Sequence, residues 1–534
     1  MLFHTWTFAV FFLVVFTCYF ALRKTRWWLH CLFAASYVFY GWWNPYYLLL
    51  ILYSTTLDFN VVGLMDRCPK EGGLPFKWKH LLGSGIGSKR LRLLYFLFVT
   101  GAFSAIGVAI WGVGNLRPMM LWLTMILSLM AMGTAFSSRK IWLIVSLINN
   151  LSLLAFFKYA GFLSETINGL LAKAGAGFSL PEAATLMPFG ADYMLPVGIS
   201  FFMFQSMSYT LDFYRGNIHR ERSFIRFATF VSFFPQLVAG PIERASHLLP
   251  QFNHCPKVER KDFSEGFSLF LVGLFKKLAM ANYLSIYVER AYDDPSSFDA
   301  SALFLATFAF AWQIYFDFSG YTDMARGVAR VFGFRLMLNF NHPYLASGLS
   351  EFWARWHISL STWFRDYVYI PLGGNRKGTI FTYRNLLITF VVSGLWHGAA
   401  WTFIVWGALH GIGTMITREL EKLPFYRDRI PKILKQIAVF LFACLTWVYF
   451  RADSMETAHL ILSRMFTTSW STPSGFPLLM GLLIAAVWSY EYLSESRFKA
   501  VLKNTVFRVA MASAMIIYLF LFSSKGGAFI YFQF

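Results

Sequence analysis

Runs of about twenty consecutive apolar residues recur along the whole chain, and this feature limits the possible folds more than any other. A helix of that length crosses a hydrocarbon layer of roughly 30 Å, where only helices and closed barrels satisfy their own backbone polar groups. Of the 534 residues, 57% are hydrophobic and 14% are charged, whereas a soluble domain carries about 25% charged residues. The sequence therefore predicts an all-α polytopic membrane protein.

The chain carries a formal charge of +20, from 47 Lys and Arg against 27 Asp and Glu. Nucleic-acid binding is one explanation of such an excess. The bases, however, cluster in short loops between apolar runs, as the positive-inside rule describes for membrane proteins. We therefore expect this charge to act at a lipid bilayer, and we expect no nucleic-acid partner.

The charge of each loop predicts an orientation. Residues 4–22 are apolar, no base precedes them and three bases follow, which reverses the charge order of a cleaved signal peptide. We expect an uncleaved first span with its N-terminus outside. This orientation places the loop 67–92, with seven bases and one acid, in the cytoplasm and the loop 164–192, with one base and three acids, outside.

The apolar pattern predicts about eleven transmembrane helices. Residues 227–239 are too short to cross and contain Pro235, so we expect re-entrant segments in the middle of the chain, buried in protein or lining a cavity. We divide one continuous membrane domain into N-terminal helices (1–225), a core (226–416) and C-terminal helices (417–534). The predicted spans lie among the apolar stretches 4–22, 27–43, 46–65, 93–113, 119–136, 141–163, 193–213, 265–290, 302–332, 383–416, 434–450, 475–493 and 507–523.

His397 is an ionisable residue inside the otherwise uncharged run 393–401. An ionisable side chain at membrane depth is costly and is therefore a candidate functional residue. The alternative is a histidine that only joins packed helices. Gly394 and Gly398 beside it allow a backbone or a substrate to approach closely. A neutral imidazole in a low-dielectric site can act as a general base on a hydroxyl, so we predict that His397 is catalytic.

The segment 351–367 combines aromatic and charged residues. Aromatic residues recur at helical spacing from Trp353 onward, and Glu351 and Arg355 are spaced as an i, i+4 ion pair. We expect an amphipathic interfacial helix with its tryptophans at the headgroup level. His357 falls on the aromatic face, so it is expected to point inward, as a second functional histidine or as a packing residue.

Charged residues also interrupt the apolar run 302–332. Asp323 and Arg326 are spaced as an ion pair, and Asp317 shares a helix face with Tyr321. Ion pairs that hold helices together inside the membrane explain these residues better than direct catalysis.

The turn 371–378 contains three glycines and the bases Arg376 and Lys377. Its backbone N–H groups and its two bases can meet a phosphate of a donor molecule. A solvated cytoplasmic turn would have the same composition.

Motifs of the common soluble enzymes are absent, since the chain has no H-E-x-x-H, P-loop, G-x-S-x-G or G-x-G-x-x-G pattern. The five cysteines are odd in number and form no C-x-x-C pair, which predicts neither a disulfide framework nor a metal site. Any chemistry should therefore use an activated donor substrate rather than a bound cofactor.

Together these segments resemble the membrane-bound O-acyltransferase family, most closely its bacterial branch, the membrane subunits of alginate O-acetyltransferase. The most specific signal is the pair of motifs around His357 and His397, forty residues apart. Ala354 departs from the pattern, because a second basic residue often stands there. The resemblance runs from residue 240 to the C-terminus, through the stretches 240–244, 317–325, 339–344, 351–374, 393–398 and 529–534.

The resemblance implies that His397 is the catalytic histidine in a tunnel near mid-membrane and that His357 is the second, cytoplasmic-side histidine. It also implies a helical ring around a thinned membrane centre, where a cytoplasmic acyl thioester meets an acceptor from the far side. Further candidates for substrate or tunnel contacts are Trp396, Asn385, Asp317, Tyr321, Arg365 and Asp366.

We therefore expect an O-acetyltransferase of the cell inner membrane that moves an acetyl group from a cytoplasmic thioester, acetyl-CoA, toward an exported polysaccharide such as alginate. The same resemblance implies a periplasmic esterase-like acetyltransferase and a polysaccharide-export complex as partners. Two alternatives remain. The donor could be a carrier-protein thioester, as in D-alanyl export for teichoic acid, or the chain could be a transporter or acyl-conducting pore without a bond-making step.

Overall fold

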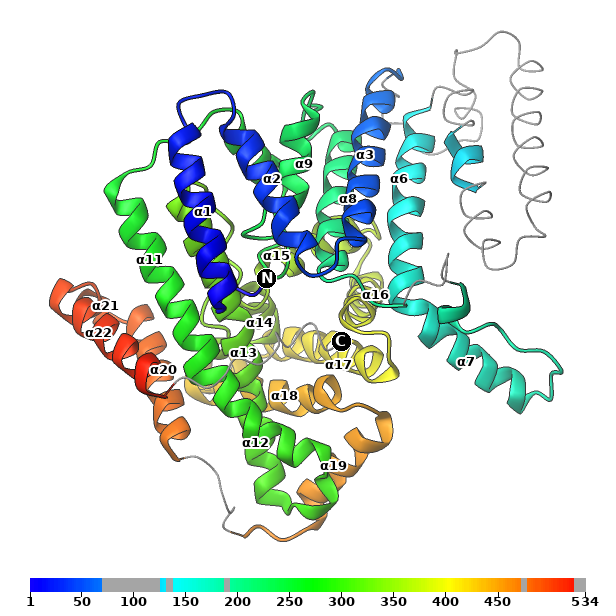
Figure 1. The fold of residues 1–534 in the computed structure, drawn as a ribbon. Coiled ribbons are helices and arrows are strands. Elements are labelled where there is room, and N and C mark those ends of the chain that lie inside the picture. The colour runs from blue at the N-terminus through cyan, green and yellow to red at the C-terminus, as the bar shows by residue number, and fades with distance from the viewer. Residues whose placement is uncertain (70–124, 131–137, 187–192, 472–477, 523–534) are drawn as a thin grey trace. The chain divides into compact units, whose positions relative to one another are not determined.

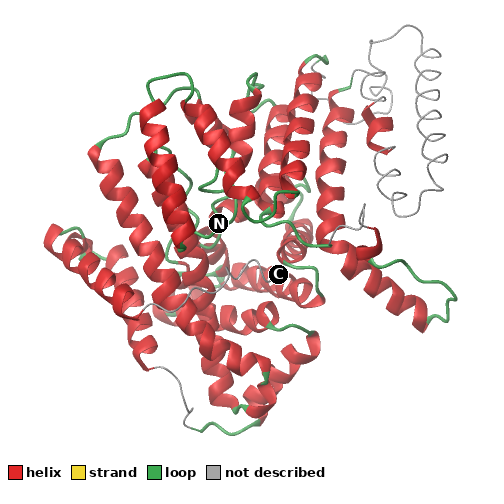
Figure 2. Ribbon diagram, in the orientation of Figure 1, coloured by secondary structure: helices red, strands yellow, loops and turns green. Residues whose placement is uncertain are grey.

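The computed structural model describes residues 1–69, 125–130, 138–186, 193–471 and 478–522. These residues form helices and loops, with no strand among them (Figure 2), so the predicted all-α class is confirmed. The predicted spans 93–113 and most of 119–136 lie outside the described residues, and the count of about eleven stays a prediction. Six described helical stretches are long and apolar enough to cross a membrane: Tyr47–Asp66, Arg139–Lys173, Arg260–Asp293, Ala300–Val331, Lys432–Arg451 and Thr505–Phe522.

The chain forms two compact units. The first contains residues 13–238 and 243–255 together with Met1, and the second contains residues 2–12, 239–242 and 256–534. Every candidate site residue belongs to the second unit. The predicted division of the chain near residues 226 and 417 stays a prediction.

The first unit is a bundle of helices (Figure 1). A short helix at 224–232 confirms that the stretch 227–239 is too short to cross a membrane. The predicted span 141–163 continues as helix to Lys173, so the loop that was expected from 164 begins later. The elements are α1 (Trp6–Leu22, whose first residues belong to the second unit), α2 (Trp28–Gly41), α3 (Tyr47–Asp66), α6 (Arg139–Leu154), η3 (Ala155–Tyr159), α7 (Ala160–Lys173), η4 (Ala183–Leu186), α8 (Ile199–Arg215), α9 (Phe224–Ser232), α10 (Ala245–Leu248) and η6 (Leu249–Phe252).

A buried carboxylate joins three helices of this unit. Asp58 of α3 is inaccessible to solvent and accepts hydrogen bonds from Ser146 (2.6 Å) and Asn150 (2.9 Å) of α6 and from Ser206 of α8. Burying a carboxylate is costly unless hydrogen bonds compensate it. The four side chains therefore hold α3, α6 and α8 in one register.

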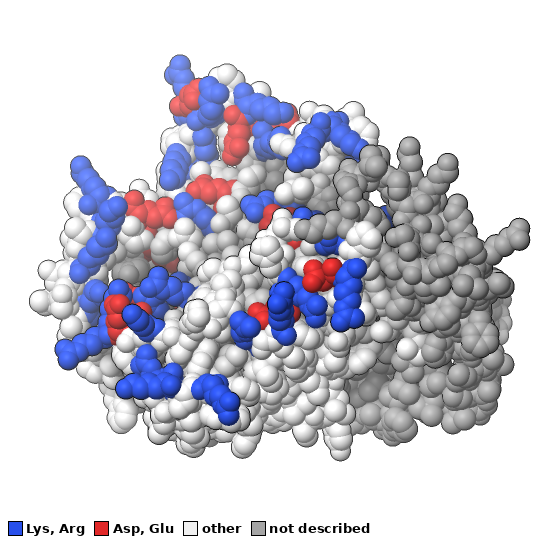
Figure 3. Space-filling model, turned by 90° about the horizontal axis from the view of Figure 1, so that it is seen from above, with Lys and Arg blue, Asp and Glu red and all other residues white. Residues whose placement is uncertain are grey.

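The basic ends of these helices lie together. The C-terminal ends of α1, α3 and α8 and the N-terminal ends of α2, α6 and α9 all lie at the upper end of the first unit in Figure 1. The residues at these ends include Arg23, Arg67, Arg139, Arg215 and Arg222. Figure 3 views the molecule from that direction, and Lys and Arg predominate over Asp and Glu on the visible face. This arrangement agrees with loop charges that alternate across a membrane.

The second unit is built around α13, a helix of 32 residues with most of its side chains buried (Figure 1). The helix α11 and its continuation pack along α13, and α16 and α17 form an adjacent pair. The elements are α11 (Arg260–Phe275), η7 (Lys276–Ala281), α12 (Asn282–Asp293), η8 (Pro295–Ser297), α13 (Ala300–Val331), η9 (Pro343–Leu345), α14 (Leu349–Arg355), α15 (Ile358–Phe364), η10 (Arg365–Tyr369), α16 (Thr379–His397), α17 (Trp401–Leu420), η11 (Phe425–Arg429), α18 (Lys432–Arg451), α19 (Met455–Thr467), α20 (Leu478–Glu495), α21 (Lys499–Leu502) and α22 (Thr505–Phe522).

Glycines allow the closest helix contacts in the second unit. A Cβ atom on Gly273 of α11 would lie 2.4 Å from the carbonyl oxygen of Gly320 on α13. A Cβ on Gly394 of α16 would lie 2.2 Å from the carbonyl oxygen of Phe403, and one on Gly407 of α17 would lie 2.3 Å from that of Phe390. These distances leave no room for a side chain. The expectation that Gly394 allows close backbone approach is confirmed.

Two predicted helices are broken. The segment 351–367 divides at Trp356–His357 into α14 and α15, so the prediction of one continuous interfacial helix was wrong. Its tryptophans are buried in protein, since Trp353, Trp356 and Trp363 expose 8%, 0% and 6% of their surface; their place at the headgroup level stays a prediction. The run 383–416 likewise divides into α16 and α17, so His397 ends a helix instead of lying inside one.

The contact between α16 and α17 generates a prediction for Gly407→Ala. The added methyl group must displace the backbone of α16 at Phe390, and overpacking of this kind costs about 1–3 kcal/mol. Thermal unfolding of the purified protein in detergent should show a lower Tm. The matched control is Gly169→Ala in α7, where nothing lies within 4 Å of the new atom; its Tm should stay equal or rise, because alanine favours helix. Equal changes in both variants would contradict the assignment.

Candidate active site

The connection between α16 and α17 fixes the position of His397. The helix α16 ends at His397, Gly398 continues in an extended conformation, and α17 begins at Trp401. Because Gly394 and Gly407 let the two backbones touch, His397 lies where the helix pair turns. Its side chain is 97% buried, since only 3% of its surface is exposed.

Aromatic rings surround the His397 imidazole. The ring centroids of Trp396 and Trp406 each lie 5.0 Å from it and are nearly perpendicular to it, and Phe450 of α18 lies at 5.4 Å. The Trp396 indole also packs against His357, with ring centroids 6.0 Å apart. The two predicted histidines therefore meet the same indole, although forty residues separate them in the chain.

His357 has an uncommon backbone conformation. It links α14 to α15 with φ +42° and ψ +54°, in the left-handed region that residues with a Cβ rarely adopt. Residues 339–341 bind both sides of this link: Asn341 N–H donates to Arg355 O, and Ile358 N–H donates to Asn339 O, each at 2.9 Å. The neighbouring backbone thus holds the strained residue, as is common at functional sites.

The side chain of Asn339 binds the same link. Its Oδ1 atom lies 3.1 Å from His357 Nδ1, 3.2 Å from Ser359 N and 2.9 Å from Ser359 Oγ. Ser359 Oγ in turn accepts a hydrogen bond of 3.0 Å from Ile242 N–H. Three stretches that are distant in the sequence therefore meet at His357.

His357 is fully buried, as expected for a side chain that points inward. Rings of Phe318, Phe340 and Trp396 pack against it, and none of them carries a charge. Burial disfavours the imidazolium and lowers the pKa of His357 to about 3. The residue is therefore a neutral imidazole at physiological pH.

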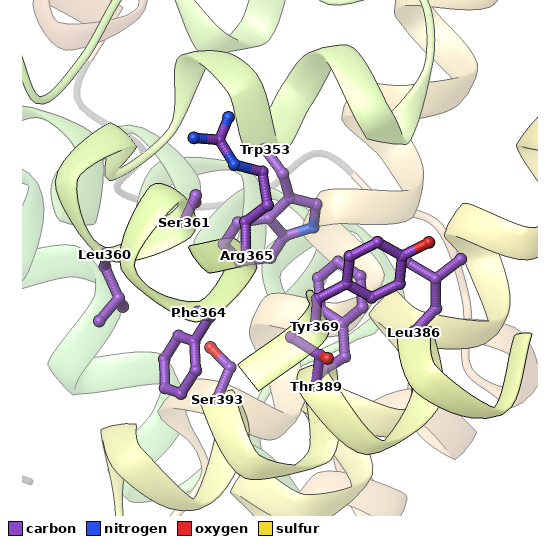
Figure 4. Close-up of a pocket in the computed structure, with 10 residues that line it drawn as sticks. Trp353, Leu360, Ser361, Phe364, Arg365, Tyr369, Leu386, Thr389 and Ser393 are labelled. Atoms are coloured by element: carbon purple, nitrogen blue, oxygen red, sulfur yellow. The ribbon is translucent and has the colours of Figure 1, made fainter. Parts of the chain in front are cut away.

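A pocket of about 220 Å³ opens beside this site (Figure 4). Its residues on α16 follow the spacing i, i+3, i+4, i+7 from Leu386 to Ser393, and His397 is the next residue on that face. The lining is apolar apart from four hydroxyl-bearing side chains and the guanidinium of Arg365, which is 60% exposed. The pocket is lined by Trp353, Leu360, Ser361, Phe364, Arg365, Tyr369, Leu386, Thr389, Phe390 and Ser393.

The first turns of α16 hold the basic turn 371–378. Asn385 is buried, and its Nδ2 donates to Gly374 O at 2.9 Å. Gly373 and Gly374 have φ values of +113° and +57°, which glycine adopts without strain. Arg376 and Lys377 are exposed on this turn. Asn385 precedes His397 by twelve residues, about 18 Å along the helix, so it supports the turn and does not contact His397.

The charged residues of α13 are paired, as predicted for ion pairs that join helices. Asp317 lies 2.7 Å from Lys277 of η7, with 4% and 2% of the two side chains exposed. Asp323 binds Lys276 at 2.8 Å and the predicted partner Arg326 at 3.3 Å. Phe318, which follows Asp317, packs on His357 at 4.6 Å. The ion pairs thus fix the helix that supports the site.

The remaining predicted residues lie apart from His397 or at the pocket rim. Tyr321 is buried and packs on Phe3 at 4.8 Å. Arg365 and Asp366 form an ion pair of 2.8 Å, and Glu351 and Arg355 form the predicted pair at the same distance. The five cysteines are free thiols, and the described residues contain no group of His, Cys, Asp and Glu able to hold a metal ion.

His397 is the next residue on the α16 face that lines the pocket, and a neutral imidazole at such a position can act as a general base on a hydroxyl. Residues 192–459, half of the chain, match the membrane-bound O-acyltransferase family. The chain belongs to this family. Both histidines, the pocket and the turn 371–378 lie inside the matched region. The family and the apolar helices together indicate a multi-pass membrane protein.

Proteins similar to this chain are named for different acyl groups and different acceptors. The chain is 42% identical over 343 residues to the Probable alginate O-acetylase AlgI of Azotobacter vinelandii (63% of this chain, 65% of that protein). It is 38% identical over 354 residues to the peptidoglycan O-acetyltransferase of Helicobacter pylori (61% and 65%). It is 26% identical over 279 residues to the teichoic acid D-alanyltransferase of Bacillus subtilis (49% and 70%). The matched region spans less than two thirds of the first two relatives.

Sequence reasoning missed three residues of this membrane-bound O-acyltransferase. Lys277 escaped notice, although a lysine in an apolar helix is the same signal that identified Asp317. His410 of α17 is fully buried, with Nε2 at 3.0 Å from Thr446 Oγ1 and its ring 4.9 Å from that of Trp406. Asn339 belongs to a matched stretch, but no local pattern indicates that it contacts His357, eighteen residues away.

The buried ion pair on α13 predicts the effect of Lys277→Met. Removal of the ammonium leaves Asp317 buried without its cation, which costs about 3–5 kcal/mol. We expect a large loss of monodisperse protein and a lower Tm in detergent. The double variant Lys277→Met/Asp317→Leu removes both charges and should recover most of the yield. A double variant as unstable as the single one would contradict the pairing.

Proposed function

We propose that this protein is an O-acetyltransferase that moves an acetyl group from a cytoplasmic thioester, acetyl-CoA, toward an exported polysaccharide. It would act in the cell inner membrane, with its N-terminus outside. The observation that carries the proposal is that buried His397 lies one helical turn after Ser393, on the α16 face that lines an apolar pocket with Arg365 among its lining residues. The relatives named as O-acetylases and O-acetyltransferases support the choice of acetyl.

The reaction assigns one proton transfer to His397. The oxygen of the acceptor hydroxyl attacks the thioester carbonyl carbon, while the imidazole of His397 takes the hydroxyl proton. The C–S bond breaks, the thiolate receives that proton, and the acetyl ester and the free thiol leave. A general base of this kind contributes about 10²–10⁴-fold to the rate. The neutral imidazole of His357, which packs against the same Trp396 indole as His397, assists the reaction.

The pocket and the nearby bases suit the donor. The mostly apolar lining fits the pantetheine arm of a coenzyme A thioester, which carries no charge along its length. Arg365 at the rim and Arg376 and Lys377 on the turn 371–378 would bind its phosphates. The acceptor would reach the site from the periplasmic side, and the acetyl group would then pass to a periplasmic esterase-like acetyltransferase and an export complex.

The first test replaces the proposed base. Membranes that contain the His397→Ala variant should transfer acetyl groups from labelled acetyl-CoA at least 10²-fold more slowly than wild type, because no other group takes the proton. The control is His459→Ala, since His459 is an exposed histidine of the same unit, on α19. Full activity of His397→Ala in correctly inserted protein would refute the role of His397. If the purified wild-type protein forms no acetyl ester, and acetyl transfer needs a partner protein, the result would favour the alternative of an acyl-conducting pore.

The second test concerns the donor. The double variant Arg376→Glu/Lys377→Glu should raise KM for acetyl-CoA about tenfold and leave kcat nearly unchanged, because phosphate contacts contribute to donor binding and not to the proton transfer. The increase should shrink at high salt. The control Lys499→Glu/Lys503→Glu changes the same charge on and just after α21. An unchanged KM for acetyl-CoA, together with activity on a carrier-protein thioester, would indicate that the carrier-protein thioester is the donor instead of acetyl-CoA.

A further inference from the structure

We infer that Asn339 is a positioning residue that holds His357 in the tautomer protonated on Nδ1, so that Nε2 carries the lone pair used at the site. The role of His357 in acetyl transfer rests on the proposed function. The tautomer itself rests only on the hydrogen bonds of residues 339–359.

The first step fixes the orientation of the Asn339 side chain. A backbone N–H can only donate, and Ser359 N lies 3.2 Å from one terminal atom of the Asn339 carboxamide. That atom must accept, so it is the oxygen; the reversed amide would bring two N–H donors together. Ser359 Oγ accepts from Ile242 N–H, which leaves its own hydrogen to donate to the same oxygen at 2.9 Å.

The second step fixes the tautomer of His357. Nδ1 of the imidazole lies 3.1 Å from the same Asn339 oxygen. Because this oxygen offers no hydrogen, Nδ1 must carry one. In a neutral imidazole the other ring nitrogen, Nε2, then holds the lone pair.

The third step explains an amide rather than a carboxylate at this position. A carboxylate against Nδ1 stabilises the imidazolium, whereas an amide oxygen orients the ring without adding charge. The ring neighbours of His357 are Phe318 of α13, Phe340 and Trp396 of α16, which are uncharged. The nearest charged group on α13, Asp317, is paired with Lys277. His397, the other titratable group nearby, packs against the same Trp396 indole, at a centroid distance of 5.0 Å.

A pair of substitutions separates orientation from charge. Asn339→Asp keeps the accepting oxygen and the shape but adds a carboxylate. The carboxylate favours the imidazolium, so Nε2 stays protonated up to a higher pH than in wild type. The pH at which the His357 ring takes its second proton, followed by its ¹⁵N shifts, should therefore move upward by at least one pH unit. Asn339→Leu removes the acceptor, and kcat/KM should fall on the order of 10²-fold across the pH range.

The matched control is Asn504→Asp, which adds the same charge at an exposed position before α22, where an aspartate can still accept the hydrogen bond from Val506 N–H. Its His357 titration should coincide with that of wild type. A coincident titration for Asn339→Asp would overturn the inference, and so would equal shifts in both aspartate variants.

A measurement without substrate tests the tautomer directly. Solid-state NMR of the purified wild-type protein labelled with ¹⁵N-histidine, after subtraction of the His357→Gln spectrum, should show a neutral ring with a protonated Nδ1. A ring protonated on Nε2, or on both nitrogens at neutral pH, would overturn the inference. Wild-type protein without acetyl-transfer activity would instead refute the proposed function, while the spectrum would still decide the role of Asn339.

Discussion

The contact of two helix backbones at Gly394 and Gly407 determines the position of the site. With no side chain between them, α16 and α17 approach closely enough for Trp396, His397 and Trp406 to pack edge to face around the turn. A methyl group on either glycine would overlap a carbonyl oxygen of the other helix. The location of the proposed base therefore depends on the absence of two side chains as much as on the presence of an imidazole.

Hydrogen bonds to a short extended segment determine the second half of the site. Residues 339–341 lie against the link between α14 and α15 and bind it through two backbone hydrogen bonds and the Asn339 side chain. Together these bonds hold His357 in a left-handed conformation that it would not adopt alone. Strain at His357 is thus compensated by bonds formed before any substrate arrives, which is the physical meaning of a pre-organised site.

Buried charges stabilise the scaffold rather than the reaction. Asp317 with Lys277 and Asp323 with Lys276 join α13 to the helix beside it, and Asp58 joins three helices of the first unit. In an apolar surrounding an unpaired charge is far more costly than a mispacked methyl group, so each pair permits one register of its helices. The charged residues of this membrane-bound O-acyltransferase thus hold helices together, whereas the buried His357 has only uncharged rings around it.

The sequence by itself determined the class of the fold, most helix positions and both histidines, because each depends on local composition. Apolar length predicts a helix in a membrane, and an ionisable residue in such a helix is conspicuous whatever surrounds it. Only the tertiary structure decided that the helix expected over 351–367 breaks at His357 and that His397 ends α16. It also decided that Lys277 pairs with Asp317 and that Asn339 contacts His357. These features arise from contacts between residues far apart in the chain, where hydrogen bonds and steric exclusion outweigh the helical preference of each segment.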